Sequence, residues 1–297
     1  MPELPEVETI RRQLAPRLEG RQLVSVEILD HRFSQPAAAE LVAAALTGAR
    51  VTRLGRRGKY LIWELDDDRS LLVHLRMTGV LLLDADPDLP HTRVRFGLSD
   101  GHLLTFVDPR RFGNGRLMPT SVERDAYLNG RLGPEPFTTA FSAAYLRSSA
   151  RDRSLPVKSF ILDQRRIAGV GNIYADEALY RAGVHPLRQA GKLTFAQWQA
   201  LREAIETALS AGIDAKGATI DDFRHLDGAH GSFQDSFLVH RRAGAPCFRC
   251  GTTIRKLVVG GRGSYVCEHC QPPPRRTAVS RPAVSAALQS GRRPAAR

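Results

Sequence analysis

The sequence predicts a multidomain α+β protein, in which an N-terminal antiparallel β-sandwich flanked by helices precedes a helical domain and a small cysteine module. Three observations lead to this prediction. Short strand-like runs fill the chain before residue 119, helical periodicity follows, and four cysteines lie between residues 247 and 270. A length of 297 residues suits about two domains plus small modules, and 42% hydrophobic residues can form packed cores.

The first 118 residues are expected to form the β-sandwich. Val7, Ile10, Leu14 and Leu18 recur at helical spacing and predict an opening helix. The alanine-rich segment Pro36–Leu46 predicts a second one. The expected strands, separated by turn signals, are Arg21–Leu29, Arg50–Leu54, Lys59–Leu65, Ser70–Leu75, Thr92–Leu98, Leu103–Val107 and Gly115–Met118.

The remaining chain is expected to divide into four parts. Residues 119–135 are predicted to be a linker, and residues 136–240 a helical domain. Residues 241–271 hold the cysteines, and the Pro/Ala/Arg/Ser-rich residues 272–297 are predicted to be disordered. Helical periodicity is found over residues 140–149, 155–164, 172–182, 194–211 and 219–226.

The charge of the chain favours a polyanionic partner. Lys and Arg number 43 against 31 Asp and Glu, which gives +12. Six arginines and no acid lie in residues 272–297, so the preceding body carries nearer +6. No apolar run approaches the roughly 20 residues that span a membrane, and no signal-peptide pattern opens the chain. We therefore expect a cytoplasmic protein without a membrane partner.

All four cysteines belong to one pattern. Cys247 and Cys250 form one knuckle, and Cys267 and Cys270 form the second knuckle after sixteen residues. This separation suits one zinc ion bound by four thiolates, with two disulfides as the alternative that an intracellular setting disfavours. A closed four-cysteine site is structural, because no coordination position is open to substrate. The intervening residues predict a β-hairpin with Arg262 near its tip.

The N-terminus admits two interpretations. If Met1 is removed, Pro2 begins the chain with a free secondary amine, and Glu3 follows. An α-amino group has a pKa of roughly 7.7–8.0, against about 10.4 for lysine, so it is a better nucleophile near pH 7. Such amines form Schiff bases with carbonyl substrates, and Glu3 is placed to act as their general acid. The alternative is that proline and acidic residues simply open a helix.

Further motifs each have a functional and a structural interpretation. Two glycines before Asn172 predict an anion site at a helix start with Asn172 as the N-cap, or an ordinary turn and cap. Arg110 and Phe112 lie in Asp108–Gly113, which suits insertion into a stacked duplex or a charged hairpin turn. His74 and Met77, at the end of a predicted strand, suit packing as well as function.

These motifs occur in one order, and in that order they resemble the bacterial formamidopyrimidine-DNA glycosylase family. The resemblance covers residues 1 to about 271 and leaves the tail outside. The N-terminal motif and the cysteine module are its most specific parts. The motifs that carry it are Pro2–Glu8, Arg56–Tyr60, His74–Gly79, Asp108–Gly113, Gly169–Tyr174 and the four-cysteine ribbon.

The resemblance implies a base-excision repair enzyme that removes oxidised purines from duplex DNA and cleaves the abasic strand. Its partner would be double-stranded DNA with oxidised bases or abasic sites, bound by a monomer whose helical domain is of the helix–two-turns–helix type and whose ribbon holds one structural Zn²⁺. Pro2 would be the nucleophile, Glu3 the acid, and Lys59 a catalytic lysine near the lesion phosphate. The DNA-binding residues would be His74, Met77, Arg110, Phe112, Lys158, Asn172 and Arg262, of which Met77, Arg110 and Phe112 fill the space left by the flipped base.

Three departures from the family pattern leave the catalytic groups in place. Arg76 stands where many relatives have glycine, Ala218 lies in a run that is more often Gly-Gly-Ser/Thr, and His240 stands where tyrosine is common. Two alternatives remain. An endonuclease VIII-like enzyme for oxidised pyrimidines is disfavoured by Leu4, and a non-catalytic DNA-binding protein is disfavoured by the intact Pro2, Glu3 and Lys59.

Overall fold

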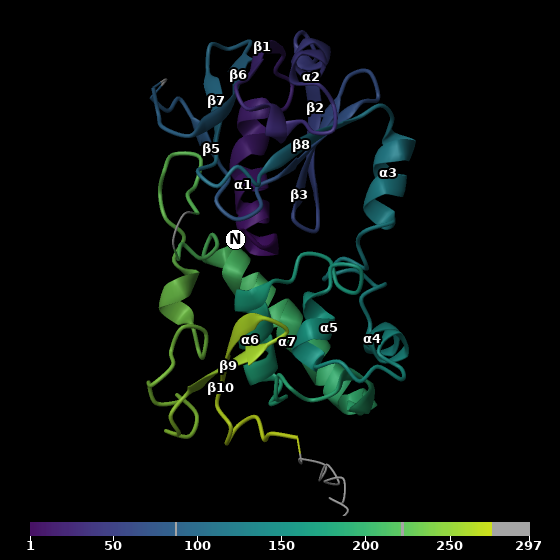
Figure 1. Ribbon diagram of the computed structural model, residues 1–297, viewed down its shortest axis with the longest axis vertical. Helices are drawn as coiled ribbons and strands as arrows, with labels where there is room; N and C mark the ends of the chain where they lie inside the picture. The colour runs from purple at the N-terminus through teal and green to yellow at the C-terminus, as the bar shows by residue number, and fades with distance from the viewer. Residues whose placement is uncertain (87, 221–222, 275–297) are drawn as a thin grey trace, which may run out of the picture.

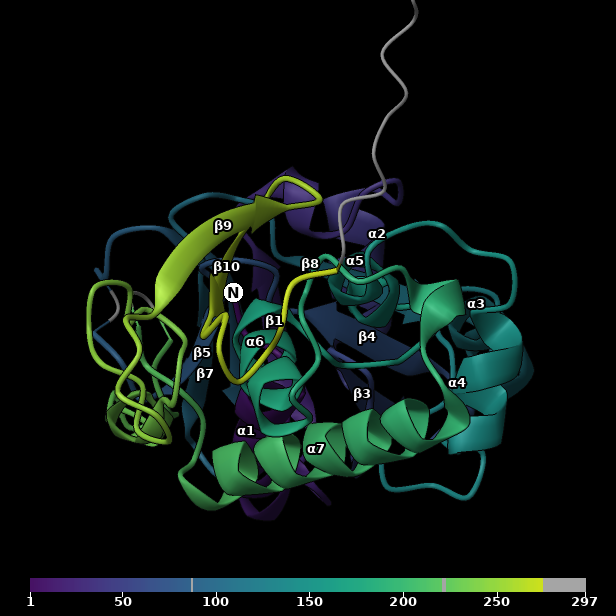
Figure 2. The same cartoon turned by 90° about the horizontal axis from the view of Figure 1, so that it is seen from below.

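The computed structural model describes residues 1–86, 88–220 and 223–274. Two bodies are stacked along the long axis of the molecule, and the N-terminus lies at their junction (Figure 1). The view from below shows the two strands of the cysteine module, β9 (Arg255–Val259) and β10 (Arg262–Val266), beside the helices of the C-terminal body (Figure 2). Within the described residues, no helix is both long and apolar enough to cross a membrane.

The N-terminal body contains two four-stranded antiparallel sheets and two helices. One sheet has the order β1-β6-β7-β5 and the other β2-β3-β4-β8. The helices are α1 (Leu4–Leu18) and α2 (Ala39–Leu46), and a 3₁₀ turn covers His31–Phe33. The strands are β1 (Leu23–Ile28), β2 (Val51–Arg57), β3 (Tyr60–Leu65), β4 (Ser70–His74), β5 (Val80–Leu83), β6 (Thr92–Leu98), β7 (Leu103–Val107) and β8 (Asn114–Met118).

Helix α1 contributes side chains to the hydrophobic core of each body. Val7, Ile10 and Leu14 are buried in one cluster with residues from both sheets, whereas Leu4 is buried in the core of the helical body. Each such side chain contributes roughly 1.5–3 kcal/mol on burial. The N-terminal end of α1, and with it Pro2, is therefore fixed at the junction of the two bodies.

The second body consists of helices around a core that includes Phe160, Tyr174 and Trp198. Its longest helix, α7, has a capping box in which Thr194 and Gln197 exchange hydrogen bonds. Helix α3 connects the two bodies. The elements are α3 (Ser121–Asn129), α4 (Ala143–Ser149), α5 (Val157–Leu162), α6 (Asn172–Arg181), α7 (Phe195–Asp214) and 3₁₀ turns at Ala190–Lys192 and Phe233–Ser236.

The cysteine module is a two-stranded hairpin of β9 (Arg255–Val259) and β10 (Arg262–Val266). It rests on the helical body, since β10 contacts α6. Its small core includes Ile254 and Val239 beside two of the cysteines, Cys247 and Cys267. The expected hairpin with Arg262 at its tip is confirmed, because Arg262 is the first residue of β10.

The fold class expected from the sequence is confirmed, with three differences in its elements. Strand β5 was not expected, and α3 lies in the stretch expected to be a linker. The helix expected over residues 219–226 is wrong, because residues 219–220 and 223–226 are not helical. Phe223 and Leu226 instead bury their side chains in the core of the N-terminal body. From residue 275 on, the tail expected to be disordered lies outside the described residues.

Candidate active site

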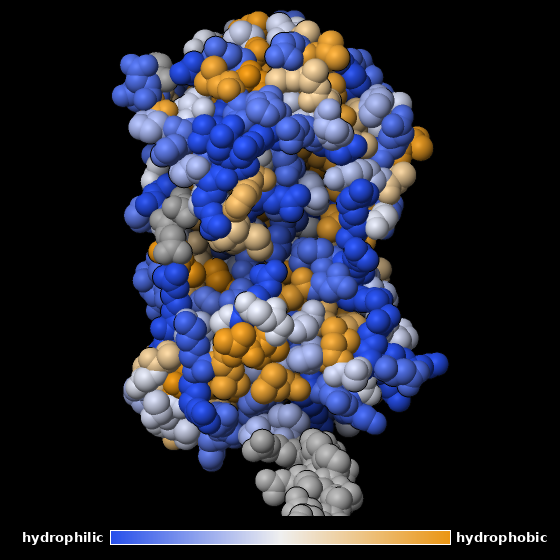
Figure 3. Space-filling model, viewed as in Figure 1, coloured by the Kyte–Doolittle hydropathy of each residue, from blue (hydrophilic) through white to orange (hydrophobic). Residues whose placement is uncertain are grey.

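A cavity of about 330 Å³ lies at the N-terminus, between the two bodies. In the space-filling view the surface is hollowed between the bodies, and both hydrophilic and hydrophobic side chains border the hollow (Figure 3). The N-terminal residues, the start of α6 and the ribbon all contribute to the cavity. Its lining consists of Met1, Pro2, Glu3, Glu6, Met77, Asn172, Ile173, Ala218, Ile220, Phe223, His240, Arg241 and Arg262.

Glu3 is held at the first turn of α6. One carboxylate oxygen, Oε1, accepts the backbone N–H of Ile173 at 3.1 Å. The other, Oε2, is buried and has no hydrogen-bond partner among the described residues. The unpaired N–H groups and the dipole of a helix start favour a negative charge at this point. Glu3 thus has one oxygen fixed and one free beside Pro2.

Two glycines make room for this arrangement. A Cβ on Gly171 would lie 2.2 Å from Cδ of Glu3, and one on Gly169 would lie 2.7 Å from Cβ of Leu4. The backbone of Gly169 also accepts the N–H of Leu4 at 3.0 Å. The predicted anion site therefore exists, but the carboxylate of Glu3 occupies it. Gly171, and not Asn172 as predicted, is the N-cap, and Asn172 begins the helix.

Glu6 lies one turn behind Glu3 and was not predicted from the sequence. Its Oε2 accepts the backbone N–H of Glu3 at 2.8 Å, and its Oε1 accepts the hydroxyl of Tyr174 at 2.7 Å and the N–H of Ala218 at 2.8 Å. Burial raises the pKa of Glu6, and the charge of Glu3 raises it further. The sequence did contain a signal for this contact, because Glu6 lies three residues after Glu3, the spacing of a capping box at a helix start.

Lys59 is the second residue of the turn Gly58–Lys59 between β2 and β3 and is 5% exposed. Burial lowers the pKa of its ammonium, the charge of Glu3 opposes this effect, and Arg262 adds to it. Lys59 does not itself line the cavity, but Glu3 and Arg262, whose charges act on it, both do. A lowered pKa makes the neutral amine more accessible, and this suits a lysine that takes part in proton transfer.

The three residues predicted to enter the duplex, Met77, Arg110 and Phe112, all belong to the N-terminal body. Met77 is 39% exposed, and Phe112 is 51% exposed. The guanidinium of Arg110 lies 5.0 Å from the centre of the Phe112 ring, so the two side chains form one cation–π pair. Exposed apolar side chains of this size are available for contact with a partner.

His74 is buried at the end of β4, where it supports a turn. Its Nδ1 accepts the backbone N–H of Arg76 at 3.0 Å, and its ring packs edge-on against Tyr60. Burial lowers the pKa of His74 to about 3, and the charges of Arg76 and Lys59 act in the same direction. In this structure His74 therefore shapes the turn that presents Met77, and its contact with DNA stays a prediction.

Lys158 does not reach the surface, contrary to the expectation that it binds phosphate. Its side chain is fully buried, with Nζ 2.7 Å from Asp176, 3.0 Å from the carbonyl oxygen of Gly263 and 2.7 Å from Oγ of Ser264. Asn172 also donates to the carbonyl of Gly263, at 3.0 Å. Both residues therefore hold strand β10 of the ribbon, which begins at the exposed Arg262.

Asp176, not predicted from the sequence, links this support to His240. Its Oδ2 lies 2.8 Å from Nδ1 of His240, while its Oδ1 pairs with Lys158. The neighbouring Glu177 accepts backbone N–H groups from Leu238, Val239 and His240. Two adjacent acids of α6 thus fix the chain that leads into the ribbon.

The four cysteines fit one zinc ion. Their sulfur atoms all lie within 4.8 Å of one another, with 3.5 Å between Cys250 and Cys267 and 3.8 Å between Cys247 and Cys270. Tetrahedral coordination at about 2.3 Å requires sulfur atoms roughly 3.8 Å apart. All four are free thiols, which excludes the two disulfides in this structure. The ribbon therefore provides one structural zinc site.

Fold and cavity together define a two-body protein with a helical domain, a zinc ribbon and an N-terminal proline at the junction. Three family models match it in succession. They describe the formamidopyrimidine-DNA glycosylase N-terminal domain (residues 1–115), the H2TH domain of the same glycosylase (132–224) and a zinc finger found in FPG and IleRS (244–273). The chain belongs to the formamidopyrimidine-DNA glycosylase family.

Relatives and solved structures agree over almost the whole chain. A formamidopyrimidine-DNA glycosylase from Parasynechococcus marenigrum is 48% identical, over 91% of this chain and 100% of the relative. A variant of the Lactococcus lactis FPG protein, solved with Fapy-dG-containing DNA, has a TM-score of 0.86 and 35% identity over 92% of this chain and 100% of its own. The L. lactis protein solved with abasic-site DNA has a TM-score of 0.85 and 34% identity, covering 91% and 100%.

Proposed function

We propose that this protein is a base-excision repair DNA glycosylase with AP lyase activity, acting on oxidised purines such as 8-oxoguanine and formamidopyrimidines in duplex DNA. One observation carries the proposal: Pro2 is buried at the junction of the two bodies, beside a carboxylate with one oxygen fixed and one free. Membership of the glycosylase family supports it, as do the L. lactis complexes with Fapy-dG and abasic-site DNA.

The chemistry begins once Met1 is removed, because until then the Pro2 nitrogen is an amide. The lone pair of the freed amine attacks C1′ of the damaged nucleotide, and the bond to the base breaks with its electrons leaving on the base, which takes up a proton from water. The proton released by the Pro2 nitrogen passes to the free oxygen of Glu3. Glu3 gives a proton to the ring oxygen of the sugar through its free oxygen, and the sugar opens to an iminium ion. This cation acidifies the C2′ proton, and loss of that proton expels the 3′ phosphate by β-elimination. A second deprotonation, at C4′, then expels the 5′ phosphate by δ-elimination.

Extrusion of the base from the duplex costs a few kcal/mol. Met77, Arg110 and Phe112 would offset part of this cost by filling the space left in the stack. Arg262, at the ribbon tip, would bind a phosphate beside the lesion, and Asn172 and Lys158 would act by holding that strand. The formal charge of +12 favours DNA through release of counterions.

Product analysis tests the proposal. End-labelled duplexes with 8-oxoguanine opposite cytosine, with an oxidised pyrimidine, and without damage are incubated with the mature protein. We expect cleavage of the 8-oxoguanine strand with phosphate at both new ends. Preferential cleavage at the pyrimidine would favour an endonuclease VIII-like activity, and binding without any cleavage would favour a DNA-binding protein.

A further inference from the structure

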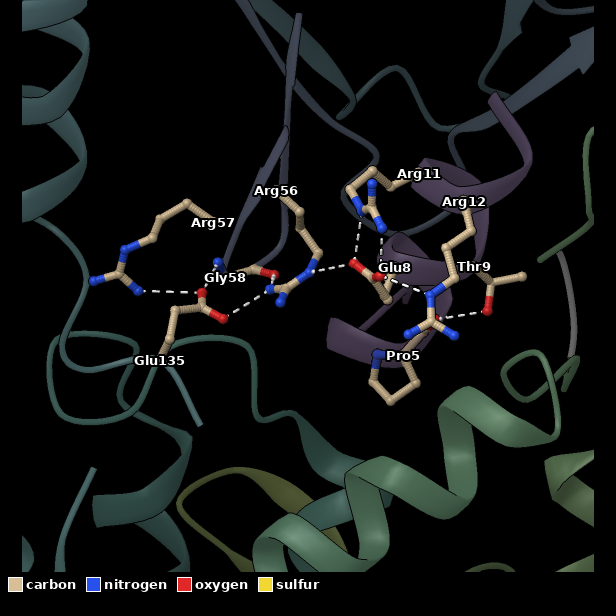
Figure 4. A network of polar contacts seen from close by, with 9 residues as sticks. All are labelled: Pro5, Glu8, Thr9, Arg11, Arg12, Arg56, Arg57, Gly58 and Glu135. Atoms are coloured by element: carbon tan, nitrogen blue, oxygen red, sulfur yellow. Dashed lines mark hydrogen bonds and ion pairs between the residues drawn. The ribbon is translucent and has the colours of Figure 1, made fainter. Parts of the chain in front are cut away.

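The turn that contains Lys59 is held by one carboxylate from outside its own sheet, that of Glu135 (Figure 4). Oε1 of Glu135 accepts the backbone N–H of Gly58 and a hydrogen bond of 3.1 Å from Arg57. Oε2 accepts a hydrogen bond of 3.0 Å from Arg56. Three consecutive residues directly before Lys59 therefore converge on this single side chain.

The backbone directly before Glu135 is bound to the helical body. Gly133 donates its N–H to the carbonyl oxygen of Gln164 at 2.8 Å, and Pro134 accepts the N–H of Ala168 at 3.1 Å. The next residue, Gly169, accepts the N–H of Leu4 at the start of α1. One stretch, residues 164–169, thus anchors both the segment that holds the Lys59 turn and the residue that follows Glu3.

Packing leaves the turn little freedom to move. Gly58 has a φ of +58°, and a Cβ there would lie 3.3 Å from Cδ1 of Leu132 and 3.6 Å from Cβ of Ala168. Leu132 and Ala168 are buried in a small core with residues of the sheet. The side chain of Glu135 is 14% exposed, and screening by water is weak at such a site, so its contacts with the two arginines are strengthened.

Arg56 extends the connection to α1. Besides Glu135, it contacts Oε2 of Glu8 at 3.1 Å, and Glu8 is in turn bound by Arg11 and Arg12 (Figure 4). The hairpin is thereby tied to α1 through Glu8 and to the helical body through Glu135. Both ties fix the position of Lys59 relative to the N-terminal end of α1.

We propose, building on the function proposed above, that Glu135 is a positioning residue that fixes the Lys59 ammonium relative to Pro2 and Glu3. Glu135 does not line the cavity and acts through the hairpin turn. Loss of its carboxylate lets the turn shift, and a misplacement of about 1 Å can cost on the order of 100-fold in rate.

A double-mutant cycle tests this coupling. Single-turnover excision from the 8-oxoguanine duplex is measured for wild type, Glu135→Ala, Lys59→Ala and the double variant, together with affinity for an abasic-analogue duplex. We expect Glu135→Ala to slow excision by roughly 10- to 100-fold with little change in affinity. In the Lys59→Ala background it should add no more than about twofold, since the two residues act as one unit. A wild-type rate for Glu135→Ala, or equal losses in both backgrounds, would overturn the proposal.

Two further variants separate positioning from folding and from loss of charge. Glu135→Gln keeps the shape and an acceptor for Gly58, so its rate should lie between those of wild type and Glu135→Ala. If Glu135→Ala is unfolded at the assay temperature, the Glu135→Gln cycle decides by the same criterion. Glu123→Ala removes an exposed acid of α3 and should excise at the wild-type rate. An inactive wild type would contradict the proposed function, whereas an active wild type with unaffected Glu135 variants would contradict the positioning role alone.

Discussion

The Glu3 carboxylate accepts the backbone N–H of Ile173 at 3.1 Å, and this bond joins the N-terminal end of α1 to the first turn of α6. Its consequence is that an element of the helical body orients the acid beside Pro2. Catalysis in this account therefore depends on how the two bodies are joined as well as on the residues in the cavity.

Replacement of Glu3 by glutamine removes the proton donor and keeps the contact with Ile173. General acid–base groups contribute typically 10²- to 10⁴-fold, so we expect base excision to slow by about that factor. Affinity for an abasic-analogue duplex should change little. Single-turnover kinetics and a binding titration check both expectations, and Glu3→Gln excising at the wild-type rate would remove Glu3 from the mechanism.

Lys158→Met tests the buried pair with Asp176. The variant leaves the Asp176 carboxylate buried without its cation, a change that costs roughly 3–5 kcal/mol. Urea unfolding should show this loss, whereas Lys192→Met, at an exposed lysine, should stay within about 0.5 kcal/mol of wild type. Equal stability of the two variants would mean that Lys158 does not hold the ribbon.

Removal of zinc should affect DNA binding more than the fold of the two bodies. The ribbon core is separate from the two large cores, so chelation should leave most of the far-UV circular dichroism unchanged. Without the ordered hairpin, Arg262 is no longer held in the position from which it would bind a phosphate. The salt dependence of abasic-duplex binding should then decrease by about 0.9 in log–log slope for each lost phosphate contact. Unchanged affinity and slope after chelation would contradict this role.

Glu8 should contribute to stability above acidic pH. Burial alone would raise its pKa, but hydrogen bonds from Arg11 and Arg12 and the charge of Arg56 bring it down to about 2. A carboxyl whose pKa is lower when folded than when unfolded stabilises the protein above its unfolded value near 4.5, and this contribution is lost as the pH falls toward 2. The difference in unfolding free energy between wild type and Glu8→Gln should shrink over that range, and a constant difference would refute the assignment.

The sequence predicted the parts of the fold that have local signals. Alternating strands, the periodicity of α1 and the cysteine spacing each follow from residues close in the chain. The segment 219–226 misled because Phe223 and Leu226 have helix-like spacing but bury their side chains in the other body. Strand β5 is four residues long, and its partner β7 lies 20 or more residues further along the chain, so no local pattern marked it.

The candidate site could be predicted where a residue type carries its own chemistry. Pro2, Glu3, Lys59 and the cysteines belong to this group. Glu135 and Asp176 could not be found, because an acid that binds arginines or a lysine more than 15 residues away has no sequence signal. The sequence also carried no sign that Lys158, predicted to bind DNA phosphate, forms a buried ion pair with Asp176 in this structure.

The Pro2 nitrogen is the proposed nucleophile, and borohydride trapping identifies the atom that attacks the sugar. The mature protein is incubated with the 8-oxoguanine duplex and borohydride, and the trapped complex is digested and mapped by mass spectrometry. We expect a reduced adduct on the N-terminal peptide, at the nitrogen of Pro2, and none on protein that retains Met1. An adduct on Lys59 or another lysine, or trapping by the Met1-bearing form, would contradict it.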